Sequence, residues 1–222
     1  MIQLVVFDWN GTLFADTLAV LRAANQSEVP MLGLPPVTVA TMRAVYEVPL
    51  VDAYVKLGVS REVFLAKAKE MTAVFHDAYE EFARTVRTRP GTKATLKKLQ
   101  ADGVNCIILS NHTQQGITTQ LHRLKLEKYF SAVLANETTS QAHHTGKQHR
   151  LEHYLRLHNI APSSVVIIGD TPEEPRIGKA LGLHTVSITE GMASRKRLQQ
   201  AEPDYLISSI PQLLTVLKRI NS

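Results

Sequence analysis

The fold is decided by residues 2–13, IQLVVFDWNGTL, in which an apolar run ends at Asp8 and the chain turns at once through Gly11. Such a run is typical of a buried strand in a parallel sheet, where both faces are covered. Ligands of open α/β sheets lie beyond the carboxyl ends of the strands. We therefore expect Asp8 to be a nucleophile or a metal ligand at the end of a buried strand.

Two further stretches repeat this pattern in distant parts of the chain. Residues 165–170, VVIIGD, end at Asp170, and residues 106–111, CIILSN, end at the polar pair Ser110 and Asn111. The carboxyl ends of parallel strands meet at one edge of a sheet. The sequence therefore predicts one active site that is assembled from three strand ends.

Strands and helices alternate from Pro90 onward, which predicts an α/β fold with a doubly wound parallel sheet. The expected helices span residues 91–102, 114–125, 148–158, 174–181 and 211–220. The expected strands span residues 105–110, 132–136, 165–170, 184–188 and 205–208.

Residues 15–86 contain no convincing strand and consist of helical stretches separated by prolines and glycines. We expect two domains, an α/β core of residues 1–14 and 87–222 and a helical cap of residues 15–86. The insertion leaves and rejoins the core near the first strand end, so it should lie above the site as a lid. Trp9 should pack under the hinge of this lid, with stacking against a substrate as the alternative.

Composition favours a soluble, cytoplasmic protein. The chain has 222 residues, 44% of them hydrophobic, without an apolar stretch long enough for a membrane span or a leader peptide at the N-terminus. Its single cysteine, Cys106, lies in an apolar strand, where a small buried side chain is the expected role. Membrane partners and disulfides are not expected, and the sequence leaves the oligomeric state open.

Charge indicates an anionic substrate. The chain carries 25 Lys and Arg against 20 Asp and Glu, which gives a formal net charge of +5. The basic residues are scattered, with the densest cluster at residues 195–197, and no basic stripe interleaved with aromatic residues is present. A small anionic molecule is therefore favoured over nucleic acid as the partner.

Four motifs in order resemble those of the haloacid dehalogenase superfamily, in its phosphoglycolate-phosphatase-like branch with a helical cap after the first motif. They are residues 8–12, Ser110, Lys147 and residues 169–174, GDTPEE. The resemblance extends through most of the chain. It implies a Rossmann-like core, a small phosphorylated substrate and Mg²⁺ as the cofactor.

The resemblance also implies roles for the carboxylates. Asp8 would attack phosphorus to form an aspartyl-phosphate, and Asp8, Asp170 and the backbone carbonyl of Asn10 would hold Mg²⁺. Glu174 would be a second carboxylate near the metal, with Glu173 as its competitor. Loop capping for the aspartates, and a favourable position at the N-terminus of the next helix for the glutamates, are the structural alternatives.

Phosphate binding is implied for a second group of residues. Ser110, Asn111 and Lys147 would contact the phosphoryl oxygens, and Ser110 and Lys147 would share in catalysis. Capping of the following helix is the alternative for Ser110. A solvated loop lysine is the alternative for Lys147, which lacks the proline that usually follows it in this branch.

Asn10 departs from the phosphatase pattern, because this catalytic position usually carries an aspartate that acts as general acid and base. Loss of such a group reduces rates by about 10² to 10⁴. Three outcomes stay open: a phosphatase with another proton route, a dehalogenase or phosphonate-type hydrolase, or a binding or regulatory protein with impaired catalysis. The sequence cannot separate a native asparagine from an engineered one.

Two groups of polar residues have no assigned role. The histidine-rich stretch comprises His143, His144, His149, His153 and His158, for which a basic rim near the phosphate is favoured over a transition-metal site. In the cap, Arg43, Glu47 and Lys56 could reach the substrate, although a solvated helix surface explains them equally well. The identity of the substrate is therefore open.

Overall fold

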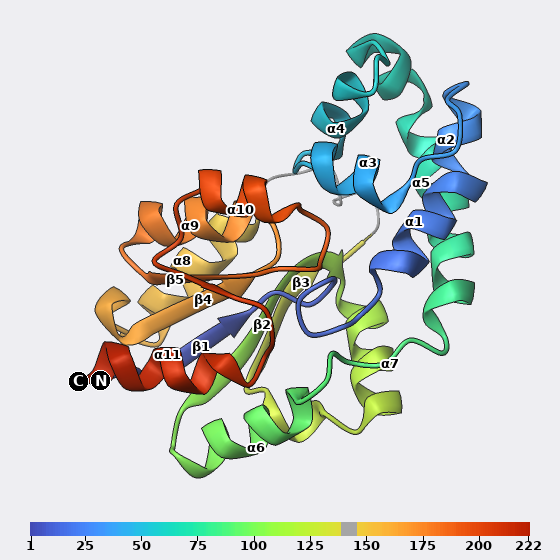
Figure 1. Cartoon of the computed structure of the whole chain (residues 1–222). Helices are drawn as coiled ribbons and strands as arrows, with labels where there is room; N and C mark the ends of the chain where they lie inside the picture. The colour runs from blue at the N-terminus through green and yellow to red at the C-terminus, as the bar shows by residue number, and fades with distance from the viewer. Residues whose placement is uncertain (139–145) are drawn as a thin grey trace.

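The computed structural model describes residues 1–138 and 146–222 and contains one six-stranded parallel sheet (Figure 1). The strands are β1 (Leu4–Phe7), β2 (Asn105–Thr113), β3 (Ala132–Asn136), β4 (Val165–Gly169), β5 (His184–Ile188) and β6 (Tyr205–Ile207). Their order is β3-β2-β1-β4-β5-β6, with every neighbouring pair parallel. This order confirms the doubly wound α/β prediction.

Register places the three polar strand ends side by side. Phe7, the last residue of β1, pairs with Ile108 on one side and with Ile168 on the other. The residues that follow these partners within two positions are Asp8, Ser110 and Asp170. The predicted assembly of one site from distant strand ends is therefore present.

Helices cover both faces of the sheet. They are α6 (Thr92–Ala101), α7 (Gln114–Leu124), α8 (Lys147–Leu157), α9 (Glu173–Leu181), α10 (Arg195–Gln200) and α11 (Gln212–Asn221), with short 3-10 helices η1 (Glu127–Tyr129) and η3 (Pro162–Ser164). Alternate residues of β1 point to opposite faces: Val5 and Phe7 join the cluster under α6, α7 and α11, whereas Leu4 and Val6 join the cluster under α8 and α9. Burial on both faces explains the continuous apolar run.

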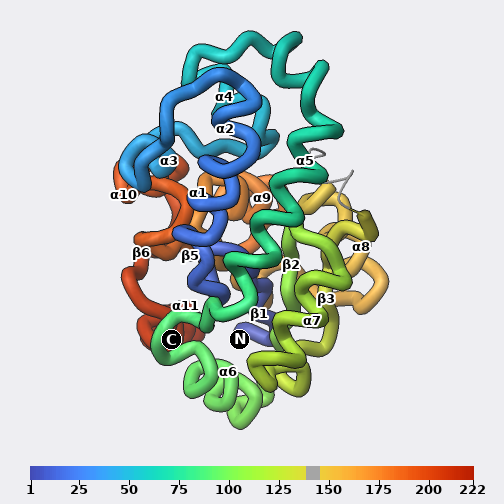
Figure 2. The backbone as a smooth tube through the Cα atoms, turned by 90° about the vertical axis from the view of Figure 1, so that its right-hand side faces the viewer, coloured from blue at the N-terminus to red at the C-terminus, as the bar shows by residue number. Residues whose placement is uncertain are grey.

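Five helices between β1 and α6 extend beyond the carboxyl edge of the sheet (Figures 1 and 2). They are α1 (Thr17–Gln26), α2 (Glu28–Met31), α3 (Val39–Val45), α4 (Leu50–Lys56) and α5 (Arg61–Ala83). Ser60 caps α5 by accepting a hydrogen bond from the Val63 amide. Tyr54, Phe64 and Met71 belong to a separate cluster within these helices, so the insertion has a core of its own.

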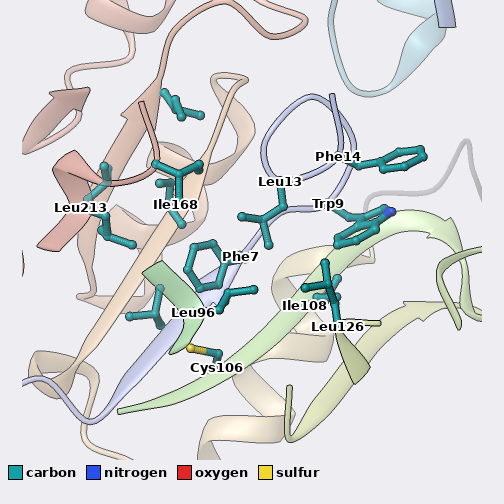
Figure 3. Packing of buried hydrophobic residues seen from close by; sticks show 14 of the residues in the cluster. Phe7, Trp9, Leu13, Phe14, Leu96, Cys106, Ile108, Leu126, Ile168 and Leu213 are labelled. Atoms are coloured by element: carbon teal, nitrogen blue, oxygen red, sulfur yellow. The ribbon is translucent and has the colours of Figure 1, made fainter. Parts of the chain in front are cut away.

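Trp9 is packed where the chain passes from β1 to the inserted helices. Its fully buried ring stacks on Phe14 with centroids 5.4 Å apart (Figure 3). Its Nε1 donates a hydrogen bond to Gln120 Oε1 at 2.6 Å. Phe14 also bridges to Thr88, where the chain returns from the insertion. Trp9 therefore packs at the hinge, as predicted, and substrate stacking is excluded by its burial.

Two local predictions were wrong. The strand expected at residues 105–110 continues to Thr113, because its pairing with β3 resumes after an irregularity between Leu109 and Thr113. Helix α10 was missed, since its six residues are too few to show a helical period.

Within the described residues, no helix is long and apolar enough to cross a membrane.

Candidate active site

Two aspartates meet at the ends of β1 and β4. Thr12 Oγ1 is 2.9 Å from both Asp8 Oδ2 and Asp170 Oδ1, so one hydroxyl lies between the two carboxylates. Gly11 makes this approach possible, because it has a φ of +74° and a Cβ there would collide with the Asp170 carboxylate. The glycine turn therefore lets the first strand end come close to the fourth.

Lys147 lies at the start of α8 and is buried among carboxylates. Its Nζ is 2.8 Å from Asp8 Oδ1, 2.5 Å from Glu174 Oε1 and 3.6 Å from Glu173 Oε2. Burial alone would lower the pKa of Lys147, but these carboxylates raise it well above its usual range. The solvated-loop alternative is excluded, because only 2% of the residue is exposed.

Negative charge exceeds positive charge at this point of the structure. Burial raises the pKa of Asp8 well above its usual value, although Lys147 opposes the shift. Burial together with Glu174 raises the pKa of Asp170 to about 6, and burial also raises that of Glu173. Several carboxylates share a single lysine, so an additional cation would relieve their repulsion.

Glu174 is held between two partners. Its Oε1 accepts from Lys147, and its Oε2 accepts from Thr171 Oγ1 at 2.8 Å. No group of three His, Cys, Asp or Glu side chains in the described part of the chain is arranged to hold a metal ion. A metal at the predicted position would thus rely on the two aspartates and on backbone oxygen.

Ser110 and Asn111 lie beside these carboxylates, on the irregular part of β2. Ser110 Oγ accepts from the His112 amide at 3.1 Å, and Asn111 Nδ2 donates to Glu173 Oε2 at 2.9 Å. Ser110 does not cap α7, because Thr113 accepts the Gly116 amide there. Ser110 and Asn111 both line the cavity described below.

Asn10 belongs to a buried network that the sequence did not reveal. Its Nδ2 is 2.6 Å from Asp16 Oδ2 and 2.8 Å from the Tyr79 hydroxyl, which donates to the same Asp16 oxygen at 2.7 Å. The Gly11 amide donates to Asp16 Oδ1 at 2.7 Å. Burial raises the pKa of the Asp16 carboxyl above its usual value.

The surroundings of residue 10 are thus matched to an amide. An asparagine donates to Asp16, whereas an aspartate would place two carboxylates together in a buried position. Sequence reasoning missed Asp16 because it follows the glycine turn without a strand end, and Tyr79 because it lies on α5, 63 residues away. It also missed Arg89, whose guanidinium donates to the Gly11 and Thr189 carbonyls and fixes the loop.

A cavity of about 210 Å³ opens over the carboxylates and under the inserted helices. Its floor includes Asp8, Asn10 and Lys147, and its roof comes from α1 to α5 and the loops between them. Of the three polar cap residues considered above, Glu47 lines this cavity. Arg43 and Lys56 do not, since they pair with Glu190 and with Glu47 respectively.

The histidine-rich stretch contributes nothing to the described site. His143 and His144 lie outside the described residues. His149, His153 and His158 are exposed on and just after α8 and do not line the cavity.

Comparison with known proteins gives consistent matches. A sequence profile of the haloacid dehalogenase-like hydrolase family matches residues 5–188. Phosphoglycolate phosphatase 1 of Pseudomonas aeruginosa is 24% identical over 220 residues, which cover 96% of this chain and 78% of that protein. A phosphoglycolate phosphatase of Vibrio vulnificus is 24% identical over 226 residues, covering 97% and 96%. The solved structure of a haloacid dehalogenase-like hydrolase from Streptococcus pneumoniae shares the fold, with a TM-score of 0.80, 20% identity and coverages of 97% and 98%.

Proposed function

The chain belongs to the haloacid dehalogenase-like hydrolase family, and we propose that it hydrolyses phosphate monoesters of small molecules in a Mg²⁺-dependent reaction. The observation that carries this proposal is the convergence of Asp8, Asp170 and Lys147 at adjoining strand and helix ends. Relatives named phosphoglycolate phosphatase support phosphate esters as the substrate class. The two-domain division, a core of residues 1–14 and 87–222 with a cap of residues 15–86, is part of the proposal.

Asp8 is the proposed nucleophile. One of its carboxylate oxygens bonds to phosphorus while the ester P–O bond breaks, and the departing alcohol oxygen takes up a proton. Water then attacks the aspartyl-phosphate, loses a proton, and releases inorganic phosphate with the Asp8 carboxylate restored. The hydrogen bond from Lys147 favours the carboxylate form that this step needs.

The residues present suit a magnesium ion. Asp8, Asp170 and the backbone carbonyl of Asn10 would hold it, since Mg²⁺ prefers carboxylate and carbonyl oxygens. Burial raises the pKa of both aspartates and neighbouring carboxylates add to the shift, so a bound cation would favour their ionised forms. When bound, the ion supplies charge that stabilises the transferring phosphoryl group. Glu174 would join the ligands only by releasing Lys147 or Thr171.

Lys147, Ser110 and Asn111 are the proposed phosphate-binding groups. All three line the cavity next to Asp8. Asn111 Oδ1 is buried without a hydrogen-bond partner in the described part of the structure, so its amide can turn without breaking a second bond there. Donors fixed in a water-poor site stabilise developing charge more strongly than they would in water.

The proton route is assigned to the network around Asn10. An amide is not a general acid or base at neutral pH, but Asp16 and Tyr79 both hydrogen-bond to Asn10, and Tyr79 lines the cavity. Burial raises the pKa of Asp16, which makes its carboxylate a stronger proton acceptor. Transfer through Tyr79 would leave Asn10 as the residue that holds the network in place.

Phosphate release with and without Mg²⁺ tests the proposal. We would assay p-nitrophenyl phosphate and a panel of phosphate esters with the parent chain, with Asp8→Asn, and with Asp77→Asn, an exposed aspartate on α5, as the matched control. We expect Mg²⁺-dependent release that Asp8→Asn alone abolishes. Halide release without Mg²⁺ would indicate a dehalogenase, and binding of phosphate without turnover would indicate a regulatory protein.

A further inference from the structure

The cavity above Asp8 has two chemically different halves. The floor is polar and comes from the ends of the strands. The roof, which would face the part of a substrate that is not phosphate, is largely apolar. Its apolar residues include Val20, Leu21, Val29, Met42, Leu50 and Phe75. Apolar surface of this kind binds groups that gain by leaving water.

No lysine or arginine lines the roof among the described residues. Among the described residues that line the cavity, Lys147 is the only Lys or Arg, and it is held by carboxylates on the floor. The sequence of residues 139–145, TSQAHHT, contains no Lys or Arg either. A negatively charged leaving group would therefore meet no lysine or arginine among the described residues of the roof.

Of the two histidines that line the cavity, His112 carries no charge at pH 7. His76 and His112 stack with ring centroids 6.0 Å apart. Burial and the neighbouring His76 lower the pKa of His112 to about 4, so its ring is neutral at pH 7. Both rings lie on the side of the cavity that also contains Tyr79.

Acidic side chains add to the bias against anions. Glu28 lines the roof, is 3% exposed, and accepts a hydrogen bond of 2.6 Å from the Tyr54 hydroxyl. Glu47 also lines the cavity, but Lys56, Arg176 and Arg197 surround it. A substrate carboxylate would have to leave water and enter beside carboxyl groups.

We infer that the substrate is a phosphate monoester of an uncharged, mainly apolar alcohol, and that esters bearing a carboxylate, such as 2-phosphoglycolate, are rejected. This inference rests on the proposed function and narrows its substrate class. The inferred substrate differs from phosphoglycolate, the substrate in the names of the relatives.

The test compares esters of matched shape. Isobutyl phosphate replaces the carboxylate of 2-phosphoglycolate by a branched methyl pair, and 3,3-dimethylbutyl phosphate is the neutral counterpart of phosphocholine. We expect kcat/KM with Mg²⁺ to be about a hundredfold higher for isobutyl phosphate than for 2-phosphoglycolate. We also expect kcat/KM to be higher for 3,3-dimethylbutyl phosphate than for phosphocholine.

A preference for 2-phosphoglycolate or for phosphocholine would overturn the inference and leave the proposed function intact. Absence of phosphate release from every ester, including p-nitrophenyl phosphate, would overturn the two together. The two failures are therefore distinguishable in one assay.

A pair of variants tests the electrostatic cause. Val45 ends α3, lines the cavity and is half-buried, so it tolerates a longer side chain. Val45→Lys should raise the kcat/KM for 2-phosphoglycolate relative to isobutyl phosphate by about tenfold. Val45→Met has a similar length without the charge and should not. An equal effect of the two substitutions would overturn the electrostatic account.

Discussion

The floor and the roof of the cavity bury charge in opposite ways. On the floor, Lys147 is surrounded by carboxylates, and its pKa is raised well above the usual range. In the roof, Glu28 has Tyr54 as its hydrogen-bond partner and no cation shifts its pKa, which burial raises to about 7. The floor therefore stabilises a charged lysine, whereas the roof favours a neutral carboxyl group.

The comparison teaches where the two properties of an enzyme of this kind are encoded. The proposed reactive groups lie at strand ends, where backbone register brings them together. The proposed binding surface for the rest of the substrate lies on helices inserted at one of those ends. A variant in one half should therefore change turnover, and a variant in the other should change selectivity or stability.

Replacing Lys147 should have the largest effect. Lys147→Met keeps the length of the side chain but leaves Asp8 and Glu174 without their buried cation, which destabilises by about 3–5 kcal/mol. We expect kcat/KM to fall by about 10² to 10³. Urea unfolding and phosphate release measure the two effects, with the exposed Lys69→Met on α5 as the control. Unchanged stability would contradict the burial of this cation.

Glu28→Gln tests the roof. In the folded chain Glu28 keeps its proton up to about pH 7, whereas the unfolded chain loses it near 4.5, so the free energy of unfolding should fall as pH rises between these values. Glutamine removes this fall, which amounts to about 3 kcal/mol, and can still accept from Tyr54. Urea unfolding from pH 5 to 8 measures it, with the exposed Glu70→Gln as the control. Parallel curves for parent and Glu28→Gln would exclude the shift.

Exchanging Asn10 and Asp16 tests whether their hydrogen-bond network stabilises the fold and transfers a proton during turnover. Asp16→Asn removes the only carboxyl of the Asn10, Asp16 and Tyr79 network and should reduce turnover, whereas Asn10→Asp places two carboxyls together and should destabilise the fold. The double variant restores one carboxyl and one amide. We expect it to recover stability with a coupling of about 1–3 kcal/mol.

Turnover distinguishes the possible roles of the exchanged pair. Recovery in the double variant, strongest for esters with poor leaving groups, would support proton transfer from this network. Additive losses in both stability and turnover would contradict the network, because residues that share no interaction do not couple.

The sequence predicted the floor better than the roof. Asp8, Ser110 and Asp170 follow apolar runs, a local pattern whose meaning is fixed by the rules of parallel sheets. By contrast, Asp16 and Tyr79 meet only because α5 returns to the start of α1, and no local pattern encodes that contact. The same holds for the apolar roof, since amphipathic helices show which residues are buried but not which of them border a cavity.

Glu47 should produce the smallest change, and one that separates closure of the roof from stability of the fold. It follows α3 and contacts Arg176 on α9 and Arg197 on α10, each at 2.5 Å, so it ties the inserted helices to the sheet domain. Lys56 and these two arginines lower its pKa although it is partly buried. Because Lys56 and Arg176 are exposed, and because a glutamine oxygen can still accept from the more buried Arg197, Glu47→Gln should destabilise by about 1 kcal/mol.

Amide hydrogen exchange at Ser194 reports this closure, since its N–H donates to the Arg43 carbonyl across the same contact at 2.9 Å. We expect faster exchange in Glu47→Gln, more so at low salt, with little change in urea unfolding. Glu190→Gln is the matched control, because Glu190 is 69% exposed and forms an ion pair with only Arg43 among the described residues. Faster exchange at Ser194 in proportion to a global loss of stability would mean that Glu47 stabilises the whole fold and does not hold the roof closed.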